Sequence, residues 1–312
     1  MKLTRLTGLL LSVLCPFAAW AGQPIVPIPR HVEIDMDKAR LGQRLFSDRR
    51  LSRDQSISCA SCHDPVHGGV DHRPVSTGVG GQKGRVNAPT VWNAVFNFRQ
   101  FWNGRAADLR EQAEGPIHNP IEMAMDDRLV NQRLQADAEY RRAFRKIYDH
   151  APNLDDALDA ITEFERALYT PDSRFDRWLR GEQTLSQEEL EGYRLFKQLG
   201  CVSCHNGINV GGNSYQYFGA VIPLRQREQA GDRYQLTQDP FDRARYKVPT
   251  LRNIELTAPY FHDGSAATLN EAVQLMAYHN LGFDLSNAEV EKIVAFLRTL
   301  TGKPPAILEP NE

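Results

Sequence analysis

Near the C-terminus, apolar side chains fall at the i, i+3, i+4 and i+7 positions that form one face of a helix. Ser286 stands before this face, in the place of an N-cap. The face comprises Val290, Ile293, Val294 and Leu297. The pattern predicts a final helix that packs through this face.

Polar residues mark a second helix of the same kind. Ser186, with Glu189 three residues later, forms a capping-box pattern that opens a helix through Phe196. Helices are also expected at 155–169 and 269–278.

Two stretches lack helical periodicity. The Thr-Pro-Asp-Ser stretch at 170–173 indicates a linker, and the Gly-rich segment 68–84 is expected to form a surface loop. No region is rich in strand patterns. The expected fold class is therefore mainly α.

Composition and the N-terminus place the protein outside the cytoplasm. The chain has 312 residues, 41% of them hydrophobic and 24% charged, which suits a globular protein with room for two domains. Residues 1–21 have the layout of a secretory signal peptide, with Lys2 and Arg5, a short apolar run and a small-residue cleavage site ending at Ala21. Removing this segment, together with Cys15, leaves 291 residues and changes the formal net charge from −2 to −4. We therefore expect a periplasmic protein with no membrane span and no affinity for nucleic acid.

The four remaining cysteines occur in two pairs, each followed at once by histidine. The motifs are Cys59-Ala60-Ser61-Cys62-His63 and Cys201-Val202-Ser203-Cys204-His205. In CxxCH, two thiols can bind one haem covalently while the histidine places an imidazole under its iron. One such motif could be a zinc half-site or a redox dithiol. Two in an exported chain with no spare cysteine indicate two haem c groups.

An internal repeat relates the two halves of the chain. Eight residues of the first half recur as identical residues 160 positions later. In the first half they are Pro89, Thr90, Asn93, Phe101, Gly104, Ala106, Ala107 and Leu109. We therefore expect two cytochrome c-like haem domains related by internal duplication, at 22–173 and 174–312.

The repeat breaks at the position where a second iron ligand is expected. Met276 follows Leu269 by seven residues in the predicted helix, and a thioether is a usual sixth ligand of an electron-carrying haem. The position 160 residues earlier is Pro116, which has no donor atom. This asymmetry predicts one six-coordinate haem for electron transfer and one haem with an open face for chemistry.

The sequence resembles the bacterial diheme cytochrome c peroxidases and their relatives of the methylamine-utilisation (MauG) type, across nearly all of the mature chain. Several short motifs carry the resemblance. They are Leu51-Ser52, Asn87-Ala88-Pro89-Thr90, Gln100-Phe101-Trp102-Asn103-Gly104-Arg105-Ala106, Gln112-Ala113-Glu114-Gly115-Pro116, Ile121-Glu122-Met123 and Pro259-Tyr260-Phe261-His262-Asp263-Gly264.

The resemblance implies the iron ligands of both haems. It implies His63 as the proximal ligand of a peroxidatic haem, and His205 with Met276 as the ligands of an electron-transfer haem. It also implies that Trp102 lies between the two haems.

The resemblance further implies a peroxide pocket and a calcium ion. Gln112 and Glu122 would line the pocket, and the ion would be held near the domain junction by Asn87 and the carbonyls of Thr257 and Pro259. Cleavage of the O–O bond of hydrogen peroxide requires one proton to move between its oxygens, and Glu122 could act there as general acid and base. The implied partners are hydrogen peroxide and a small donor, either a reduced cytochrome c or a cupredoxin, and the resemblance also implies a homodimer.

The sequence departs from the peroxidase pattern in one loop. Many members carry a histidine there, in a Thr-Ser-Ile-Gly-His-like stretch, which blocks the peroxidatic iron until the other haem is reduced. Here Val79 stands at that position, and valine cannot bind iron. We therefore expect activity without reductive activation, unless His67 or His72 in the same loop reaches the iron.

Two other functions are consistent with parts of this pattern. MauG-type oxidases also have an open first haem and use peroxide to modify a partner protein, but their second haem carries tyrosine where this chain has Met276. A plain diheme electron carrier would require His67 or His72 to bind the first iron. The open first haem favours the oxidase and Met276 favours the peroxidase, and we rank peroxide reduction first because Met276 suits a haem that accepts single electrons.

Overall fold

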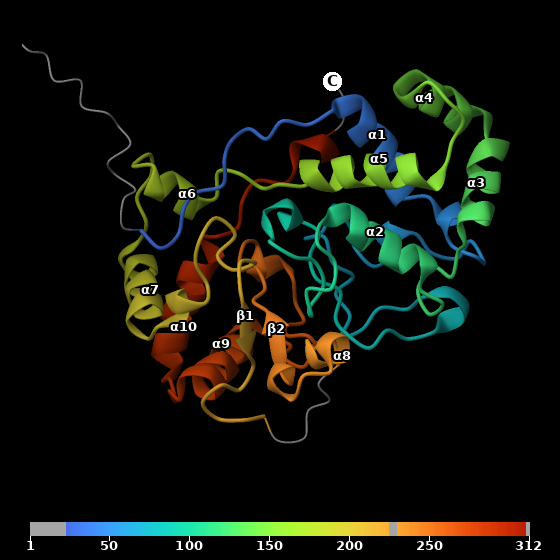
Figure 1. The fold of residues 1–312 in the computed structure, drawn as a ribbon. Helices are drawn as coiled ribbons and strands as arrows, with labels where there is room; N and C mark the ends of the chain where they lie inside the picture. The colour runs from blue at the N-terminus through green and yellow to red at the C-terminus, as the bar shows by residue number, and fades with distance from the viewer. Residues whose placement is uncertain (1–22, 225–229, 310–312) are drawn as a thin grey trace, which may run out of the picture.

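The computed structural model describes residues 23–224 and 230–309, and helices make up most of its regular structure (Figure 1). This confirms the mainly α fold class. The signal peptide predicted at residues 1–21, with its Cys15, lies outside the described residues. Within the described ranges, none of the helices combines the length and apolar character needed to cross a membrane.

Five helices of the first half surround one apolar core, in which α1 and α5 cross at the centre. Their first turns carry side-chain caps, such as Asn153 at the start of α5. The helices are α1 (Met36–Phe46), α2 (Leu109–His118), α3 (Asp127–Ala136), α4 (Ala138–Tyr148) and α5 (Leu154–Ala167).

The second half repeats this arrangement with α7 and α10 at the centre of a second core. A two-stranded antiparallel sheet, with Gln216 opposite Tyr246, lies at one side of it (Figure 1). The elements are α6 (Arg174–Leu179), α7 (Gln187–Gln198), β1 (Tyr215–Tyr217), α8 (Tyr234–Thr237), β2 (Arg245–Lys247), α9 (Leu269–Met276) and α10 (Asn287–Arg298).

The helices predicted from the sequence are present. The capping box at Ser186 and Glu189 opens α7, and Ser286 caps α10 through a second capping box. The helix predicted at 155–169 is α5. The helix predicted at 269–278 is α9, and its last turn widens into a π-helical turn at Ala277–Leu281.

The central helix pair of each half meets through a glycine. A Cβ atom at Gly42 would lie 1.9 Å from the carbonyl oxygen of Ala160, and one at Gly192 would lie 1.8 Å from that of Lys292. Both distances are far below contact, so only glycine permits these crossings. The two helix pairs are thus equivalent in detail, as expected of an internal duplication.

The connection between the halves, predicted at 170–173, is non-helical, and its two ends, Thr170 and Ser173, are buried. Thr170 is 1% exposed, and its Oγ1 accepts hydrogen bonds from Nδ2 of Asn93 at 2.8 Å and Nδ2 of Asn253 at 2.9 Å. These asparagines are 160 positions apart, and both are fully buried with positive φ. Thr170 therefore joins the two copies of the repeat at one point.

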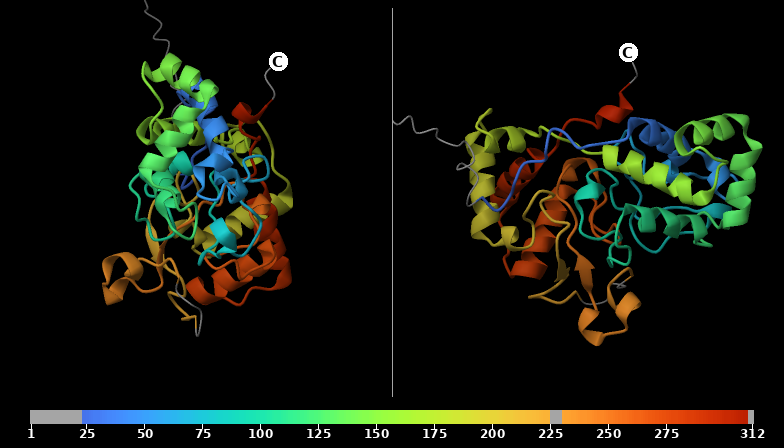
Figure 2. Two further views of the ribbon diagram at one scale, coloured as in Figure 1. Left: turned by 90° about the vertical axis from the view of Figure 1, so that its right-hand side faces the viewer. Right: turned by 45° about the horizontal axis from the view of Figure 1, so that its top comes forward.

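The two ends of the chain cross over to the opposite halves. Ile25 belongs to the core of the second half, and Ile307 belongs to the core of the first. Buried Arg252 holds the N-terminal segment by donating to the carbonyl oxygen of Val26 at 2.9 Å. Figures 1 and 2 show the segment before α1 running from beside α7 to the first half, and the last turn lying near α1. The limits 22–173 and 174–312 stay a prediction. The core of each half also includes a residue from the terminal segment of the other half.

Candidate functional site

The second CxxCH motif lies in a wide cavity of the second half. Cys201 begins a 3₁₀ turn, and the amide of His205 donates to the Cys201 carbonyl oxygen at 3.0 Å, which closes the motif into one compact turn. The cavity is lined by both cysteines, His205 and Met276. Burial lowers the pKa of His205 to about 4, so its imidazole is neutral and able to bind a metal. Two thiols, an imidazole and a thioether on one cavity fit a covalently bound haem c.

The first CxxCH motif has the same local structure. Cys59 begins an equivalent turn, and the amide of His63 donates to the Cys59 carbonyl oxygen at 2.9 Å. Burial lowers the pKa of His63 and raises that of the Cys59 thiol. The four cysteines form no disulfide with one another. The first motif therefore fits a second haem c by the same geometry.

Helices α2 and α9 begin at equivalent positions of the repeat, so the residues along one helix can be paired with those along the other. Glu111 at the start of α2 accepts from the amide of Ala107, and Glu271 at the start of α9 accepts from that of Ala267. Met276 is thus the structural equivalent of Pro116, as the repeat predicted. The first half therefore offers no thioether where the second half has one.

Glu122 lies close to the first haem motif. Its carboxyl accepts from Nδ2 of Asn119 at 2.7 Å, and burial raises its pKa while the nearby Arg105 opposes that rise. The same carboxyl is close enough to the thiols of Cys59 and Cys62 to raise the pKa of both. A carboxyl with a raised pKa beside a haem is suited to moving protons.

Gln112 lies half-buried on α2, the helix that leads directly into Asn119 and Glu122. Its assignment to the peroxide pocket stays a prediction.

The segment that carries Val79 packs against Glu122. The amide of Val79 donates to the Glu122 carbonyl oxygen at 2.9 Å, and a Cβ atom at Gly78 would lie 2.0 Å from the Ile121 carbonyl oxygen. Val79 is 7% exposed. The segment 68–84 is irregular, as expected, but it is not wholly a surface loop, because parts of it fill the space beside Glu122.

His67 and His72 make other contacts. The His67 side chain is 71% exposed, and its Nδ1 lies 2.8 Å from Oδ2 of Asp64. Both ring nitrogens of His72 lie near carbonyl oxygens, those of Ala258 at 3.1 Å and of His67 at 3.2 Å. Both imidazoles are thus held by other partners in this structure, whereas the electron-carrier hypothesis requires one of them to bind the first iron.

Trp102 stands at the junction of the halves. It belongs to the first half, yet it lines the cavity that contains His205 and Met276. Its Nε1 donates to the Asn87 carbonyl oxygen at 2.9 Å, and its ring centroid lies 6.3 Å from that of His262, its counterpart in the repeat. This position agrees with a residue between the two haems, a role that stays a prediction.

The three residues predicted to bind calcium line the same cavity. These are Asn87, Thr257 and Pro259. The side-chain NH₂ of Asn87 donates to the Arg73 carbonyl oxygen at 2.7 Å, which leaves its amide oxygen to face another partner. Across 23–224 and 230–309, no group of three His, Cys, Asp or Glu residues could hold a metal. Neutral oxygens of this kind suit calcium, and the site stays a prediction.

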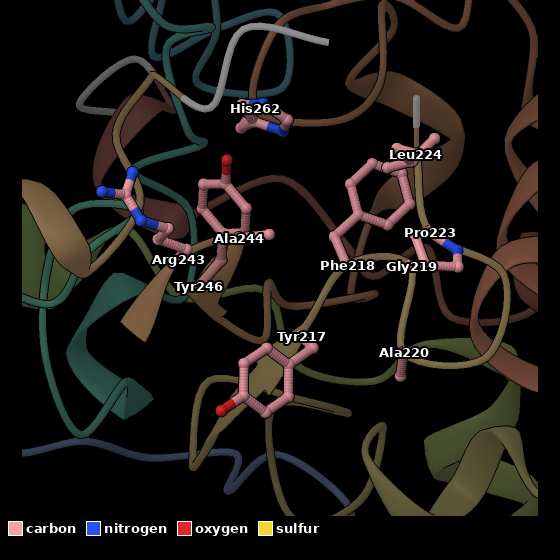
Figure 3. A pocket seen from close by; sticks show the side chains of 10 residues that line it. All are labelled: Tyr217, Phe218, Gly219, Ala220, Pro223, Leu224, Arg243, Ala244, Tyr246 and His262. Atoms are coloured by element: carbon pink, nitrogen blue, oxygen red, sulfur yellow. The ribbon is translucent and has the colours of Figure 1, made fainter. Parts of the chain in front are cut away.

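Sequence reasoning missed two buried residues of the cavity wall. Tyr246 stacks on His262, with ring centroids 4.5 Å apart, and its buried hydroxyl has no hydrogen-bond partner among the residues that the structure describes. Both rings also line an adjoining cavity of about 270 Å³ (Figure 3). Lys247 is the repeat counterpart of Asn87, and burial lowers its pKa to about 8. The 160-residue offset would have singled out Lys247.

Comparisons with known proteins agree with this geometry. Residues 36–184 match the family model of the di-haem cytochrome c peroxidases, and residues 190–301 match that of cytochrome c. The chain is 49% identical over 287 residues to the cytochrome c551 peroxidase of Nitrosomonas europaea, covering 91% of this chain and 86% of that one. It is 33% identical over 343 residues to the methylamine utilization protein MauG of Paracoccus denitrificans, covering 85% and 88%.

A solved structure shows the same arrangement of the chain. It is a MauG-like protein associated with microbial copper homeostasis, with a TM-score of 0.77 and 29% identity over 89% of this chain and 93% of that one. The match spans both halves. The cytochrome c551 peroxidases of Nitrosomonas europaea and Pseudomonas aeruginosa, at 49% and 43% identity, are more similar in sequence than MauG at 33%. The chain belongs to the bacterial di-haem cytochrome c peroxidase family.

Proposed function

We propose that this periplasmic enzyme reduces hydrogen peroxide to water at its first haem, using electrons that enter singly at its second haem. The observation that carries the proposal is the contrast between equivalent positions. Met276 lines the second haem cavity, while its counterpart Pro116 has no donor atom and Glu122 lies beside the first haem motif instead. The second site could supply two protein ligands to its iron, whereas the first site leaves one coordination position free for peroxide.

A haem with an open face supplies the site where peroxide binds, and the side chains handle its protons. Glu122 accepts the proton of peroxide and returns it to the oxygen that leaves as water. Gln112 orients peroxide by donating a hydrogen bond from its amide. Burial of Glu122 supports this role because a raised pKa makes its carboxylate a better proton acceptor.

Electrons come from a small reduced protein, either a cytochrome c or a cupredoxin, and pass through the His205 and Met276 site. Trp102 lies on the route between the halves, where its indole shortens the path and excludes water. Its position on the second cavity, with its carbonyl oxygen bonded to the Lys247 amide at 2.7 Å, supports a fixed ring. A bound calcium ion would hold this junction together.

The enzyme needs no reductive activation. Val79 is the basis of this part of the proposal, because its side chain has no donor atom and its amide is bonded to the Glu122 backbone. The exposed positions of His67 and His72 support it further.

Steady-state peroxide consumption with reduced cytochrome c tests the proposal. The enzyme is assayed in its oxidised form and again after pre-reduction by one electron, and both forms are expected to turn over at once. Negligible turnover in both would refute peroxide reduction. Turnover only after pre-reduction would refute the open first haem and leave the reaction itself standing.

A MauG-like protein oxidase is the second candidate, favoured by the same open first haem. Met276 on the second cavity counts against it, since a thioether suits a haem that accepts single electrons. Incubation with peroxide and a total periplasmic extract, followed by mass spectrometry of oxidised tryptophan, separates the two. Peroxide-dependent modification of one protein without turnover of cytochrome c would favour the oxidase.

A further inference from the structure

One carboxyl group of the first half has a buried oxygen without a hydrogen-bond partner in the part of the chain that the structure describes. Glu165 lies on α5 and is 3% exposed, and its Oε2 has no hydrogen-bond partner among the described residues. A charged carboxylate that is shielded from water and lacks a hydrogen-bond partner destabilises the folded protein. The group is therefore either protonated or balanced by a positive charge close to it. Peroxide cleavage as proposed above does not use it.

The repeat shows what Glu165 faces. Phe164 on α5 and Phe296 on α10 hold equivalent places, because each lies beside the glycine at the central helix crossing of its half. The next residue is Glu165 in the first half and Leu297 in the second. Leu297 lines the cavity that contains Cys201 and His205. By equivalence, Glu165 faces the first haem site.

The electrostatics of the first haem motif agree with this placement. The charge of Glu165 is close enough to Cys59 to raise the pKa of that thiol, so the carboxyl lies near the first haem attachment point. Burial alone raises the pKa of Glu165 to about 8. Helices α1, α2 and α3 and the turn Ala94–Phe96 pack against α5, and no charged group that they carry in the described structure offsets this effect.

We propose that Glu165 couples proton uptake to reduction of the first haem. Its carboxylate takes up one proton when that haem gains one electron, and it releases the proton when that haem is oxidised. The electron comes from the reduced protein donor and the proton from water, and the O–H bond of the carboxylic acid forms in the same step. The carboxylate is disfavoured by the added electron because charges interact strongly in a dry interior. The second haem, with Leu297 in this place, has no such partner.

This inference rests on the first haem site and not on peroxide reduction, so its test uses reduction potentials. The holoenzyme is titrated spectroelectrochemically from pH 6 to pH 9, and the two haems are distinguished by their different ligation. Full coupling of one proton to one electron lowers the midpoint potential by about 59 mV per pH unit. We expect the first haem to approach this slope over part of the range.

The variants Glu165→Gln, which keeps the shape, and Glu165→Leu, which copies the second half, should each flatten the pH dependence at the first haem. Redox-difference infrared spectra should lose a protonated-carboxyl band in both. The second haem of the same molecule is the control, and its slope should not change. An unchanged slope at the first haem in either folded variant, or an equal change at both haems, would overturn the proposal.

Discussion

The two halves share a framework and differ at the positions that carry chemistry. Gly42 and Gly192 set the same helix crossing, and Asn93 and Asn253 bind the same threonine. Four pairs of counterparts differ at positions that line the second cavity or lie near the first haem motif. The pairs are Pro116 and Met276, Glu165 and Leu297, Trp102 and His262, and Asn87 and Lys247.

This contrast explains how one unit can serve two purposes. Residues that hold the backbone are needed in both copies, because the turn that presents CxxCH must be the same for each haem. Residues that face the haem can change one at a time without disturbing that turn. The predictions below each change one such position, or one shared position, and ask whether the two halves respond differently.

The largest effect is expected from Glu122→Gln, which keeps the hydrogen bond from Asn119 but removes the base. Loss of general acid and base catalysis costs about 10²–10⁴-fold in rate, so kcat/KM for peroxide should fall by this factor. Haem content and both absorption spectra should be unchanged. Exposed Glu33→Gln is the matched control, and an equal loss there, or no loss at Glu122, would remove the proposed role.

The pH dependence of kcat/KM in the wild-type enzyme also tests the role of the Glu122 carboxyl. Burial raises the pKa of Glu122 above its ordinary value of 4.5. The group must be deprotonated to accept the proton of peroxide, so kcat/KM should fall as the pH is lowered through this raised pKa. Steady-state assays between pH 4 and pH 8 should show the acid limb above pH 4.5 in wild type and no such limb in Glu122→Gln.

The substitution Val79→His would give the first haem a second protein ligand, as the second haem is predicted to have. The new imidazole stands beside the Glu122 backbone and could bind the oxidised iron. We expect a low-spin first haem and about 10–100-fold less turnover in the oxidised form, equivalent to about 1.4–2.8 kcal/mol of ligand binding. Pre-reduction by one electron should restore activity. Val79→Leu is the control of similar shape, and a high-spin spectrum in both variants would contradict the expectation.

Much of the contrast between the two halves could be predicted from the sequence, because it depends on residue types at fixed spacings. Three features can be recognised without knowledge of tertiary contacts. They are the CxxCH motifs, the capping boxes at Ser186 and Ser286, and the absence of a thioether at Pro116, the counterpart of Met276. The resemblance to a known family pointed to Glu122, whose position beside Cys59 the structure then supplied.

Other features depend on contacts between distant segments. The burial of Thr170 arises because two asparagines converge on it, and no local pattern distinguishes it from an exposed linker residue. The exchange of Ile25 and Ile307 between the cores is also invisible in sequence, because any apolar residue near a terminus looks alike. Glu165 occupies a helical position whose environment becomes clear only when α5 is compared with α10.

A smaller change in activity is expected from Met276→His, which keeps the second iron six-coordinate but removes the thioether. A methionine ligand raises haem potential, so the substitution should lower the potential of the second haem. Every 59 mV is a tenfold change in the electron-transfer equilibrium, and we expect about tenfold slower turnover with reduced cytochrome c. Spectroelectrochemistry should show the first haem unchanged. A shift at the first haem alone would mean that the ligand assignment is wrong.

The smallest effect concerns the shared framework and should be the same in both halves. Asn93→Ala and Asn253→Ala each remove one donor to Thr170 and leave buried backbone groups less well satisfied, at a cost of about 1–2 kcal/mol in the free energy of unfolding. Because both side chains share one acceptor, the double variant should lose less than the two single losses added together. Thermal unfolding of the holoenzyme measures all three, with Asn213→Ala, whose side-chain amide bonds only within its own turn, as control. If one single variant unfolds far more easily than the other, or if the losses simply add, Thr170 does not join the two copies as an equal partner of both.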